Sequence, residues 1–263
     1  MVMKQDLRKK INLLLKSRKV FKNWYMCPIV YFKLINQKYV IFETRSGLKI
    51  KLRVNSTDLM ALTHVWLIQE YSNPDFKIND TDIIIDVGSH IGLFSLFASQ
   101  FCKNGKIYCF EPVKENFDLL SSNIELNQIT NIVSFNLAVS DESTIVKIFI
   151  NNDESGHSMF YPTSTAINIR SITLKKIFDD NNIEECNFLK LDCEGAEYNI
   201  IDSLPNDYFT KIKKMIIEYH LADTKPELLE RLIKKLEKFY VRIIRRALFS
   251  DIGFLYVNKQ KNH

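Results

Sequence analysis

Short apolar runs recur along the chain after residue 80, and segments with helical periodicity separate most of them. Strands that are buried on both faces read as continuous apolar runs, and strands that alternate with helices form right-handed βαβ units. The pattern predicts a doubly wound α/β domain whose sheet is mostly parallel, with a tail that can close it antiparallel. The expected strands are 82–87, 106–110, 132–137, 144–150, 188–191, 215–217 and two within 240–257, and the expected helices are 91–101, 113–127 and 196–203.

Residues 1–78 lack this alternation and predict an N-terminal extension of helices and a β-hairpin, followed by one domain over 79–263. Asp58 is a plausible N-cap for a helix over 59–71, which Asn73-Pro74 would end. Two β-rich segments, a glycine turn and an alternating segment come first, at 29–35, 39–43, 46–47 and 48–54.

The N-terminus is strongly basic, with eight Lys and Arg between residues 4 and 22. Leu7, Ile11, Leu14 and Leu15 lie at helical spacing among them, and a helix that packs on its own domain is favoured over one that rests on an anionic membrane. The whole chain has 36 Lys and Arg against 31 Asp and Glu, a net charge too small to indicate a nucleic-acid partner.

Five cysteines without a C-x-x-C pair, together with no recognisable export signal, predict reduced thiols in a cytoplasmic protein. The longest stretch without charged residues, 87–102, is too short to span a bilayer. Nothing in the sequence indicates an oligomeric state.

The junction between the first strand and helix of the domain reads Ile85-Asp86-Val87-Gly88-Ser89-His90-Ile91-Gly92. Gly88 would let the backbone approach a ligand, and Gly92 would let the helix lie close to the strand. Glu111 ends the next strand, nineteen residues after Gly92, where a carboxylate can accept both hydroxyls of a ribose. This arrangement predicts a cofactor that contains a nucleoside.

The same loop excludes the common phosphate-containing cofactors. The dinucleotide pattern needs three glycines, and Gly105-Lys106 is followed by Ile107, where a Walker loop needs Ser or Thr. An acidic residue two positions before the first glycine would repel a pyrophosphate but suits an ammonium group. S-adenosylmethionine carries an ammonium, a sulfonium and a ribose without phosphate, and is therefore the predicted cofactor.

Four segments, taken together, resemble the FkbM family of S-adenosylmethionine-dependent methyltransferases. They are the glycine turn, Cys-Phe-Glu-Pro (109–112), Leu-Lys-Leu-Asp-Cys-Glu-Gly-Ala-Glu (189–197) and Ile-Ile-Glu-Tyr-His (216–220), and the resemblance covers roughly residues 55–220. It implies the class I, Rossmann-like methyltransferase fold, with a seven-stranded sheet whose last strand is antiparallel. It also implies O-methylation, often of sugars or secondary metabolites.

The resemblance implies site residues as well. Asp86 and Gly88 would line the methionine half of the cofactor with Gly92 behind them, Glu111 would hold the ribose, and Ala138 would lie beside the adenine. The family more often has a small residue where this chain has His90, whose ring is expected at the helix start near solvent or a backbone carbonyl. Ser89 and Pro112 complete the predicted cofactor site.

Polar residues end the fourth and fifth strands of the domain, which would bring them to one edge of the sheet. The predicted catalytic residues are Asp192, Glu194 and His220, with Glu218 beside them. His220 can remove the acceptor proton while Asp192 orients its ring. Alternatively, Asp192, Glu218 and His220 can hold a divalent metal ion, although no separate metal motif is present and none is predicted. Glu194 can instead belong to the first turn of the next helix.

Three further expectations concern the surroundings of the site. Lys190 lies inside a buried strand and is expected to pair with one of these acids. Thr57, Asp58 and Tyr71 would contact cofactor or substrate if the extension covers the sheet. The polar loop 151–165, with Gly156, His157 and Ser158, is expected to form part of a lid.

The sequence thus predicts an O-methyltransferase for a hydroxyl of a sugar, a glycan or a secondary metabolite. A nucleic-acid substrate is disfavoured, because the fourth strand ends in Asp-Cys-Glu-Gly and not in a proline–aromatic loop. The alternatives are a non-catalytic module that binds cofactor or glycan, and an NAD-linked dehydrogenase.

Overall fold

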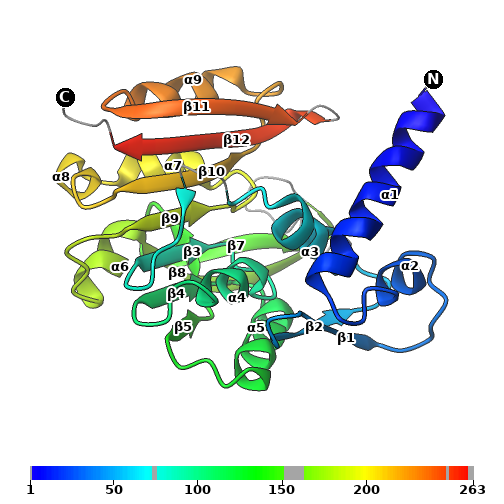
Figure 1. Cartoon of the computed structure of the whole chain (residues 1–263). Helices are drawn as coiled ribbons and strands as arrows, with labels where there is room; N and C mark the ends of the chain where they lie inside the picture. The colour runs from blue at the N-terminus through cyan, green and yellow to red at the C-terminus, as the bar shows by residue number, and fades with distance from the viewer. Residues whose placement is uncertain (1, 73–75, 151–162, 247–248, 260–263) are drawn as a thin grey trace.

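A seven-stranded sheet with the strand order β11-β12-β10-β9-β3-β4-β5 forms the centre of the computed structural model, which describes residues 2–72, 76–150, 163–246 and 249–259 (Figure 1). The inner strands pair in parallel, and β12 runs antiparallel to both β10 and β11. The predicted mostly parallel sheet with its antiparallel last strand is confirmed. The strands are β3 (Ile83–Val87), β4 (Lys106–Phe110), β5 (Ile132–Phe135), β9 (Phe188–Leu191), β10 (Lys214–Tyr219), β11 (Phe239–Arg246) and β12 (Phe249–Lys259).

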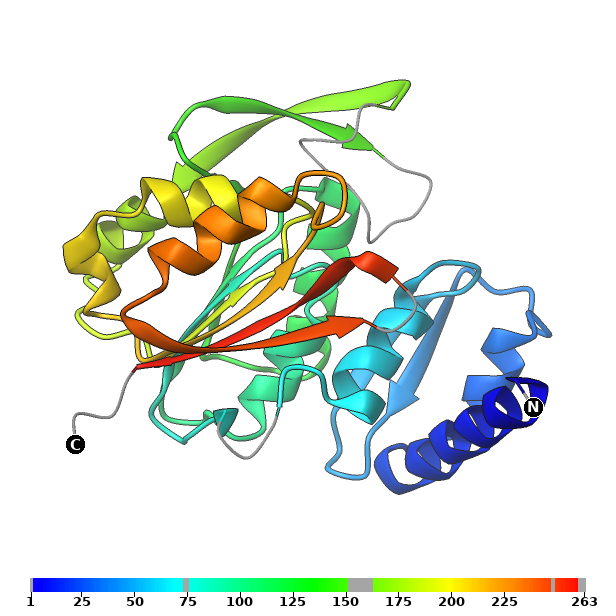
Figure 2. The same cartoon turned by 90° about the horizontal axis from the view of Figure 1, so that it is seen from above.

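Helices cover both faces of this sheet, as Figure 2 shows from above. One face packs against α4 (Leu93–Ser99) and α5 (Lys114–Leu126). The other packs against α6 (Leu174–Asp180), α7 (Glu197–Ser203) and α9 (Pro226–Lys235), with α8 (Asn206–Phe209) at the edge. Successive residues of a strand point to opposite faces of the sheet. Ile84 packs in the core with α4 and α5, and Ile85 packs in the core with α6, α7 and α9. Both faces being covered explains why the strand sequences are apolar without alternation.

The predicted hairpin of the extension is present. It consists of β1 (Tyr39–Glu43) and β2 (Lys49–Arg53), paired antiparallel around a turn at Ser46-Gly47. The strand predicted over 29–35 is wrong, because residues Met26–Tyr31 form the short helix α2. Only Val30 of that helix is buried, so the β-branched and aromatic residues there have no sheet face to pack against.

The predicted helix 59–71 is shorter and less regular than its periodicity indicated. It consists of α3 (Asp58–Leu62) followed by a π-helix η1 (Thr63–Ile68), and it ends at the left-handed residue Gln69. Asp58 does not cap it. Its carboxylate instead accepts hydrogen bonds from the backbone N–H and the guanidinium of Arg53.

The extension and the sheet share one core, in which Phe42 and Trp66 belong to the same buried cluster as Phe94 and Phe188. The division of the chain into an extension and a domain at residue 78 stays a prediction. Among the described side chains of α1 (Val2–Val20), Leu13 and Val20 pack against this cluster.

α1 packs on its own domain, as favoured, but through Leu13 and Val20 and not through the apolar residues that the spacing singled out. Ile11, Leu14 and Leu15 are 48%, 37% and 54% exposed, and the side chain of Leu7 lies outside the described residues. No helix in the described part of the chain combines the length and apolarity that crossing a membrane requires.

A second, three-stranded sheet stands beside the first. Its strands β6 (Ala138–Ser140), β7 (Ile145–Ile150) and β8 (Thr165–Thr173) have the order β6-β8-β7. The strand near 144–150 is confirmed, and β8 was not predicted. Most of the predicted lid, residues 151–162 with Gly156, His157 and Ser158, lies outside the described residues. All five cysteines are free thiols.

Candidate active site

The glycine turn between β3 and α4 lies directly against the end of β9. Gly88 has a φ of +73°, and a Cβ on it would come within 1.7 Å of the backbone oxygen of Asp192. Gly92 has a φ of +86°, and a Cβ there would meet Leu120 of α5 at 2.4 Å. The close approach predicted for Gly88 is therefore made to the neighbouring strand end, and the close contact of Gly92 is made to a helix. The turn and the end of β9 form one continuous backbone surface.

Two of the predicted cofactor residues, Ser89 and Asp86, stabilise this turn by hydrogen bonds inside the fold. The Ser89 hydroxyl donates to the Asp86 carbonyl at 2.8 Å and accepts from the Phe110 N–H at 3.0 Å. The Asp86 carboxylate is fully buried, and it accepts hydrogen bonds from Ser95 Oγ at 2.6 Å and Lys190 Nζ at 3.0 Å. Asp86 was predicted to line the methionine half of the cofactor, but the structure places its carboxylate inside the fold, where it supports the turn through Lys190.

Glu111 is held at the carboxyl end of β4 by backbone donors. Its Oε2 accepts from the His90 N–H at 2.8 Å, and its Oε1 accepts from the Val113 N–H at 3.0 Å. Burial raises the pKa of Glu111 to about 7, against the lowering effect of these hydrogen bonds. Pro112 follows half-buried, and Ala138 is buried at the start of β6. A carboxylate accepts about four hydrogen bonds, and Asn116 Nδ2 is a third, longer donor to Oε1 at 3.4 Å, so Glu111 retains one position for a hydroxyl donor.

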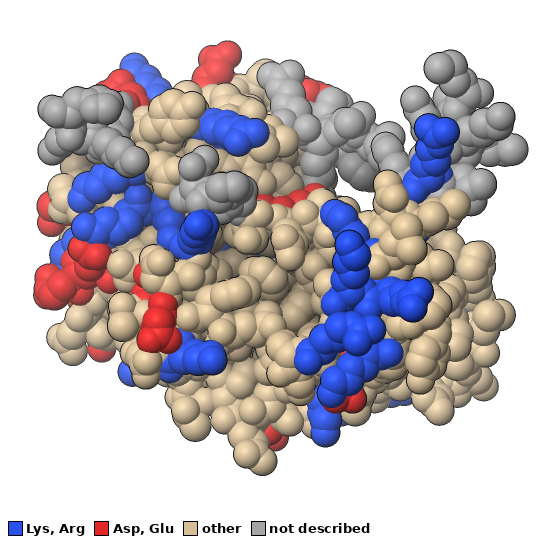
Figure 3. Space-filling view, viewed as in Figure 1, with Lys and Arg blue, Asp and Glu red and all other residues tan. Residues whose placement is uncertain are grey.

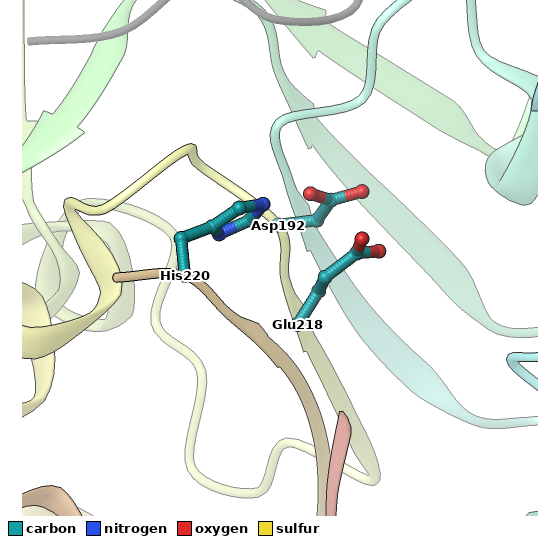
Figure 4. A group of neighbouring side chains, drawn as sticks. All are labelled: Asp192, Glu218 and His220. Carbon is teal, nitrogen blue, oxygen red and sulfur yellow. The ribbon is translucent and has the colours of Figure 1, made fainter. Parts of the chain in front are cut away.

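The polar ends of β9 and β10 meet as predicted. Leu191 lies opposite Ile217 in the parallel register, which places Asp192 and Glu218 side by side. One potential ligand atom from each of Asp192, Glu218 and His220 lies within 4.8 Å of the other two, and Figure 4 shows the three side chains converging. The trio predicted as an alternative metal site is therefore brought together. We call these three residues the acceptor rim.

Tyr71 of the extension closes this rim. Its hydroxyl lies 2.9 Å from Asp192 Oδ2 and 3.0 Å from Glu218 Oε2, as a donor to both carboxylates. Burial, and then the charges of Asp192 and Glu218, raise the pKa of Tyr71 well above its usual value, so the phenol keeps its proton. Of the three extension residues predicted to contact the site, Tyr71 is the one that reaches the rim.

Glu197, to which the sequence reasoning assigned no role, holds the His220 ring. Its Oε1 is 3.1 Å from His220 Nδ1 and accepts from the His220 N–H at 2.9 Å, so the orienting residue is Glu197 and not Asp192. Glu194, in a left-handed conformation with φ of 52°, lies 3.5 Å from Nε2 of the same ring. The second acid of the Glu-Gly-Ala-Glu segment (194–197) is the feature of the sequence that could have indicated this role for Glu197.

The carboxylates around His220 decide its charge. Burial alone would lower the pKa of His220, but the charge and hydrogen bond of Glu197, with the charges of Glu194 and Glu218, raise it to about 10. These carboxylates therefore favour the protonated form of His220 in the free protein. Burial raises the pKa of Glu194 to about 8.

Lys190 pairs with acids as predicted. Its Nζ is 3.0 Å from Asp86 and 3.8 Å from Asp192, and it donates to the Gly88 carbonyl at 2.9 Å. Burial opposes its charge, but Asp86 and Asp192 outweigh that effect and raise its pKa. Five acids surround two basic side chains here: Asp86, Asp192, Glu194, Glu197 and Glu218 around Lys190 and His220.

This excess of acidic residues lies beside a glycine turn that lacks the phosphate-binding patterns, and it fits a cationic ligand. A sulfonium and an ammonium group meet that requirement, and Glu111 can accept a hydroxyl donor at the next strand end. The residues present therefore fit S-adenosylmethionine. They fit a divalent cation less well, because Tyr71 and Lys190 already supply positive or donor groups to the rim carboxylates.

The other extension residues meet the turn at His90. Its Nε2 lies 3.1 Å from Arg53 Nη2 and 3.5 Å from Asp58 Oδ1, so the ring packs against the extension. Thr57 precedes Asp58, and its hydroxyl oxygen is buried without a hydrogen-bond partner in the structure. Arg53 was not predicted, because its role depends on how the hairpin docks.

The fold and the site together define a methyltransferase of the class I type. The strand order, the antiparallel seventh strand, the glycine turn and the carboxylate after the second strand of the domain are all present. Residues 86–248 match the sequence model of the methyltransferase FkbM domain, and the chain belongs to this family. It is therefore an S-adenosylmethionine-dependent methyltransferase, which leaves no place for the dehydrogenase alternative.

Curated relatives agree with this assignment at low identity. Methyltransferase 1 of Beauveria bassiana is 22% identical over 168 residues, 56% of this chain and 67% of that protein. The 31-O-demethyl-FK506 methyltransferase FkbM of Streptomyces tacrolimicus is 22% identical over 58% of this chain and 71% of its own length. The hexuronic acid methyltransferase AglP of Haloferax volcanii is 22% identical over 55% of this chain and 58% of its own length.

Proposed function

We propose that this protein transfers a methyl group from S-adenosylmethionine to a hydroxyl of a sugar, a glycan or a secondary metabolite. The observation that carries the proposal is the contact between the glycine turn and the acceptor rim, which meet at Gly88 and Asp192. Relatives named for 31-O-demethyl-FK506 and for a hexuronic acid support an acceptor of this class.

The proposed cofactor seat uses groups from three strand ends. Glu111 would accept a ribose hydroxyl, Ala138 would lie at the adenine, and the backbone from Gly88 to Gly92 would line the methionine half. The negative rim favours the positively charged donor. When bound, the cofactor supplies a methyl carbon already activated by its sulfonium, so most of the acceleration can come from holding the acceptor oxygen in line.

Asp192 is the group we assign to receive the acceptor hydroxyl. About a quarter of its side chain is exposed (26%), whereas Glu218 and His220 are buried, so an entering acceptor reaches Asp192 first. Its carboxylate would accept the hydroxyl hydrogen bond and take the proton as the new C–O bond forms. A base of this kind contributes ~10²–10⁴-fold. Protonated His220, held by Glu197, would balance the charge of the rim.

Binding and transfer test the proposal separately. Calorimetry with the full chain is expected to show binding of S-adenosylmethionine by wild type and by Asp192→Asn alike. Transfer of label to a panel of hexuronic acids, neutral sugars and secondary-metabolite alcohols is expected to fall by ~10²-fold or more in Asp192→Asn. Asp202→Asn, which changes a similarly exposed acid away from the site, should keep full activity.

The product identifies the chemistry. A methyl ether on the acceptor survives mild alkali, whereas a methyl ester on a hexuronic acid carboxyl is hydrolysed. An alkali-labile product would overturn the hydroxyl assignment, and absence of S-adenosylmethionine binding would overturn the proposed cofactor site.

A further inference from the structure

The chain divides sharply by charge at the end of the hairpin. Residues 1–53 hold 14 Lys and Arg against two acidic residues, whereas residues 54–263 hold 22 against 29. The first segment therefore carries a net charge of +12 and the remainder carries −7. The modest overall charge conceals a strongly basic extension attached to an acidic catalytic domain. Such asymmetry indicates an anionic partner for the extension.

The solvent face of α1 combines this charge with exposed aliphatic side chains. Ile11 and Leu15 are four residues apart and therefore share one face, on which they are 48% and 54% exposed. Residues three or four positions from them on that face are basic and exposed: Arg8, Arg18 and Lys19. The opposite side of the helix is the anchored one, where Ser17 is buried and Lys16 Nζ donates to the Leu67 carbonyl at 3.0 Å.

The end of α2 and the loop after it, residues 31–34, present a second exposed apolar segment, which meets α1 at Lys10, beside the Ile11–Leu15 face and not on it. Tyr31, Phe32 and Leu34 are 58%, 65% and 70% exposed, the two rings packing edge to face at 5.0 Å. The loop begins beside α1, because Lys10 Nζ lies 5.8 Å from the centre of the Tyr31 ring. Lys33 between them is also exposed. We call residues 8–19 of α1, together with residues 31–34 at the end of α2 and in the loop after it, the basic apolar face.

Lys and Arg side chains form a dense band over the extension side of the molecule in Figure 3, with few acidic side chains among them. In Figure 1, α1 stands away from the sheet. A second copy of the same face is a poor partner, because a two-fold contact would bring like charges together. A nucleic acid would neutralise the charge but would leave Ile11, Leu15 and Leu34 without an apolar environment.

We propose that the basic apolar face docks the protein on an anionic lipid bilayer. The aliphatic and aromatic side chains enter the headgroup boundary, while the Lys and Arg side chains lie among the anionic headgroups. The proposal requires no transmembrane segment, and it does not depend on which acceptor is methylated. A single amphipathic helix binds weakly, and the loop supplies the second apolar contact.

Flotation with vesicles tests this docking directly. The full-length protein is expected to float with phosphatidylcholine vesicles that contain phosphatidylserine, and to stay at the bottom with phosphatidylcholine alone. Arg18→Glu with Lys19→Glu removes two cations, each worth about fivefold in partitioning near an anionic surface, so binding should fall about 25-fold or more. Phe32→Ser with Leu34→Ser should reduce binding at every salt concentration.

Matched controls change similar side chains elsewhere on the surface. Lys234→Glu with Lys238→Glu reverses two exposed charges near α9, and Ile145→Ser with Ile243→Ser removes two exposed apolar side chains. Both controls should float like wild type. Calorimetry with S-adenosylmethionine and a circular dichroism melt on every variant check that the fold is intact.

Three results would overturn the proposal. They are no flotation of the wild type with phosphatidylserine vesicles, equal loss in the control variants, and no effect of the Phe32 and Leu34 changes. Tighter binding to duplex DNA or RNA than to the vesicles, lost in the Arg18 and Lys19 variant, would assign the face to nucleic acid instead.

Discussion

Replacing Tyr71 by phenylalanine tests whether the extension builds the acceptor rim or only covers it. The substitution keeps the ring, which packs edge-on against Phe94 and Phe254 at 5.4 and 5.8 Å, and removes only the hydroxyl. That hydroxyl has one proton to donate, shared between Asp192 and Glu218 at 2.9 and 3.0 Å. A hydrogen bond to a charged group contributes about 1.5–3 kcal/mol, so we expect Tyr71→Phe to cost about 2 kcal/mol.

Two measurements separate a rim role from a packing role. At 2–4 °C per kcal/mol for a chain of this size, the expected loss lowers Tm by about 4–8 °C. Because Asp192 would no longer be held in place, kcat for methyl transfer should also fall, by ~10-fold or more, without a comparable change in cofactor binding.

The matched control is Tyr208→Phe. The Tyr208 hydroxyl donates to Asp179 at 2.5 Å, but that carboxylate is exposed and its hydrogen bond contributes little. We expect a change below about 0.5 kcal/mol and unaltered kcat. If Tyr71→Phe matches wild type in both Tm and kcat, the hydroxyl does not organise the rim, and Tyr71 only packs.

Four further outcomes follow from the site. Glu111→Gln should weaken S-adenosylmethionine binding about tenfold or more in calorimetry, since one ribose acceptor is lost; equal affinity would place the ribose elsewhere. The free protein should lose stability as the pH rises from 6 to 10. The pKa values of Glu111 (about 7), Glu194 (about 8) and His220 (about 10) are all raised, so the folded state holds these protons more tightly than the unfolded chain does. A urea midpoint that is flat or rises with pH would contradict this. Gly88→Ala should cost about 4 kcal/mol in urea unfolding, because its Cβ would overlap the Asp192 carbonyl, whereas Gly47→Ala meets nothing within 4 Å and should cost about 1 kcal/mol; similar losses would refute the close contact. Dialysis against a chelator should leave transfer unchanged, and activity lost and then restored by Mg²⁺ would make the rim a metal site.

The sheet and the rim could be predicted because they depend on local patterns. Continuous apolar runs identify doubly covered strands, and parallel neighbours bring their carboxyl ends to one edge, which is how Asp192, Glu218 and His220 could be placed together. The Lys190 pairing followed from the cost of burying a lone ammonium group. In the register of the sheet Lys190 lies opposite Asp86, which fixes the partner.

Other features depend on tertiary contacts that leave no local signal. The β-branched and aromatic residues of α2 favour a strand, but no neighbouring strand offers them a partner. The hydrophobic spacing of α1 indicated a packed face, yet Ile11 and Leu15 face outward and Ser17 faces inward. Arg53 reaches His90 only because the hairpin docks on the glycine turn.

The charge argument for the cofactor rested on Asp86, and the structure assigns that argument to other acids. The acid before the glycine turn was expected to meet the positive donor, and Asp86 instead neutralises Lys190 inside the fold. The negative charge that remains comes from the rim and from Glu197, because burial raises the pKa of Glu194 to about 8 and keeps it largely protonated at neutral pH. A pyrophosphate placed against this cluster would be repelled by most of its neighbours, whereas a sulfonium is attracted by them. Lys190 therefore serves the site by holding Asp86 and the Gly88 carbonyl together, so that the turn and the rim keep one geometry.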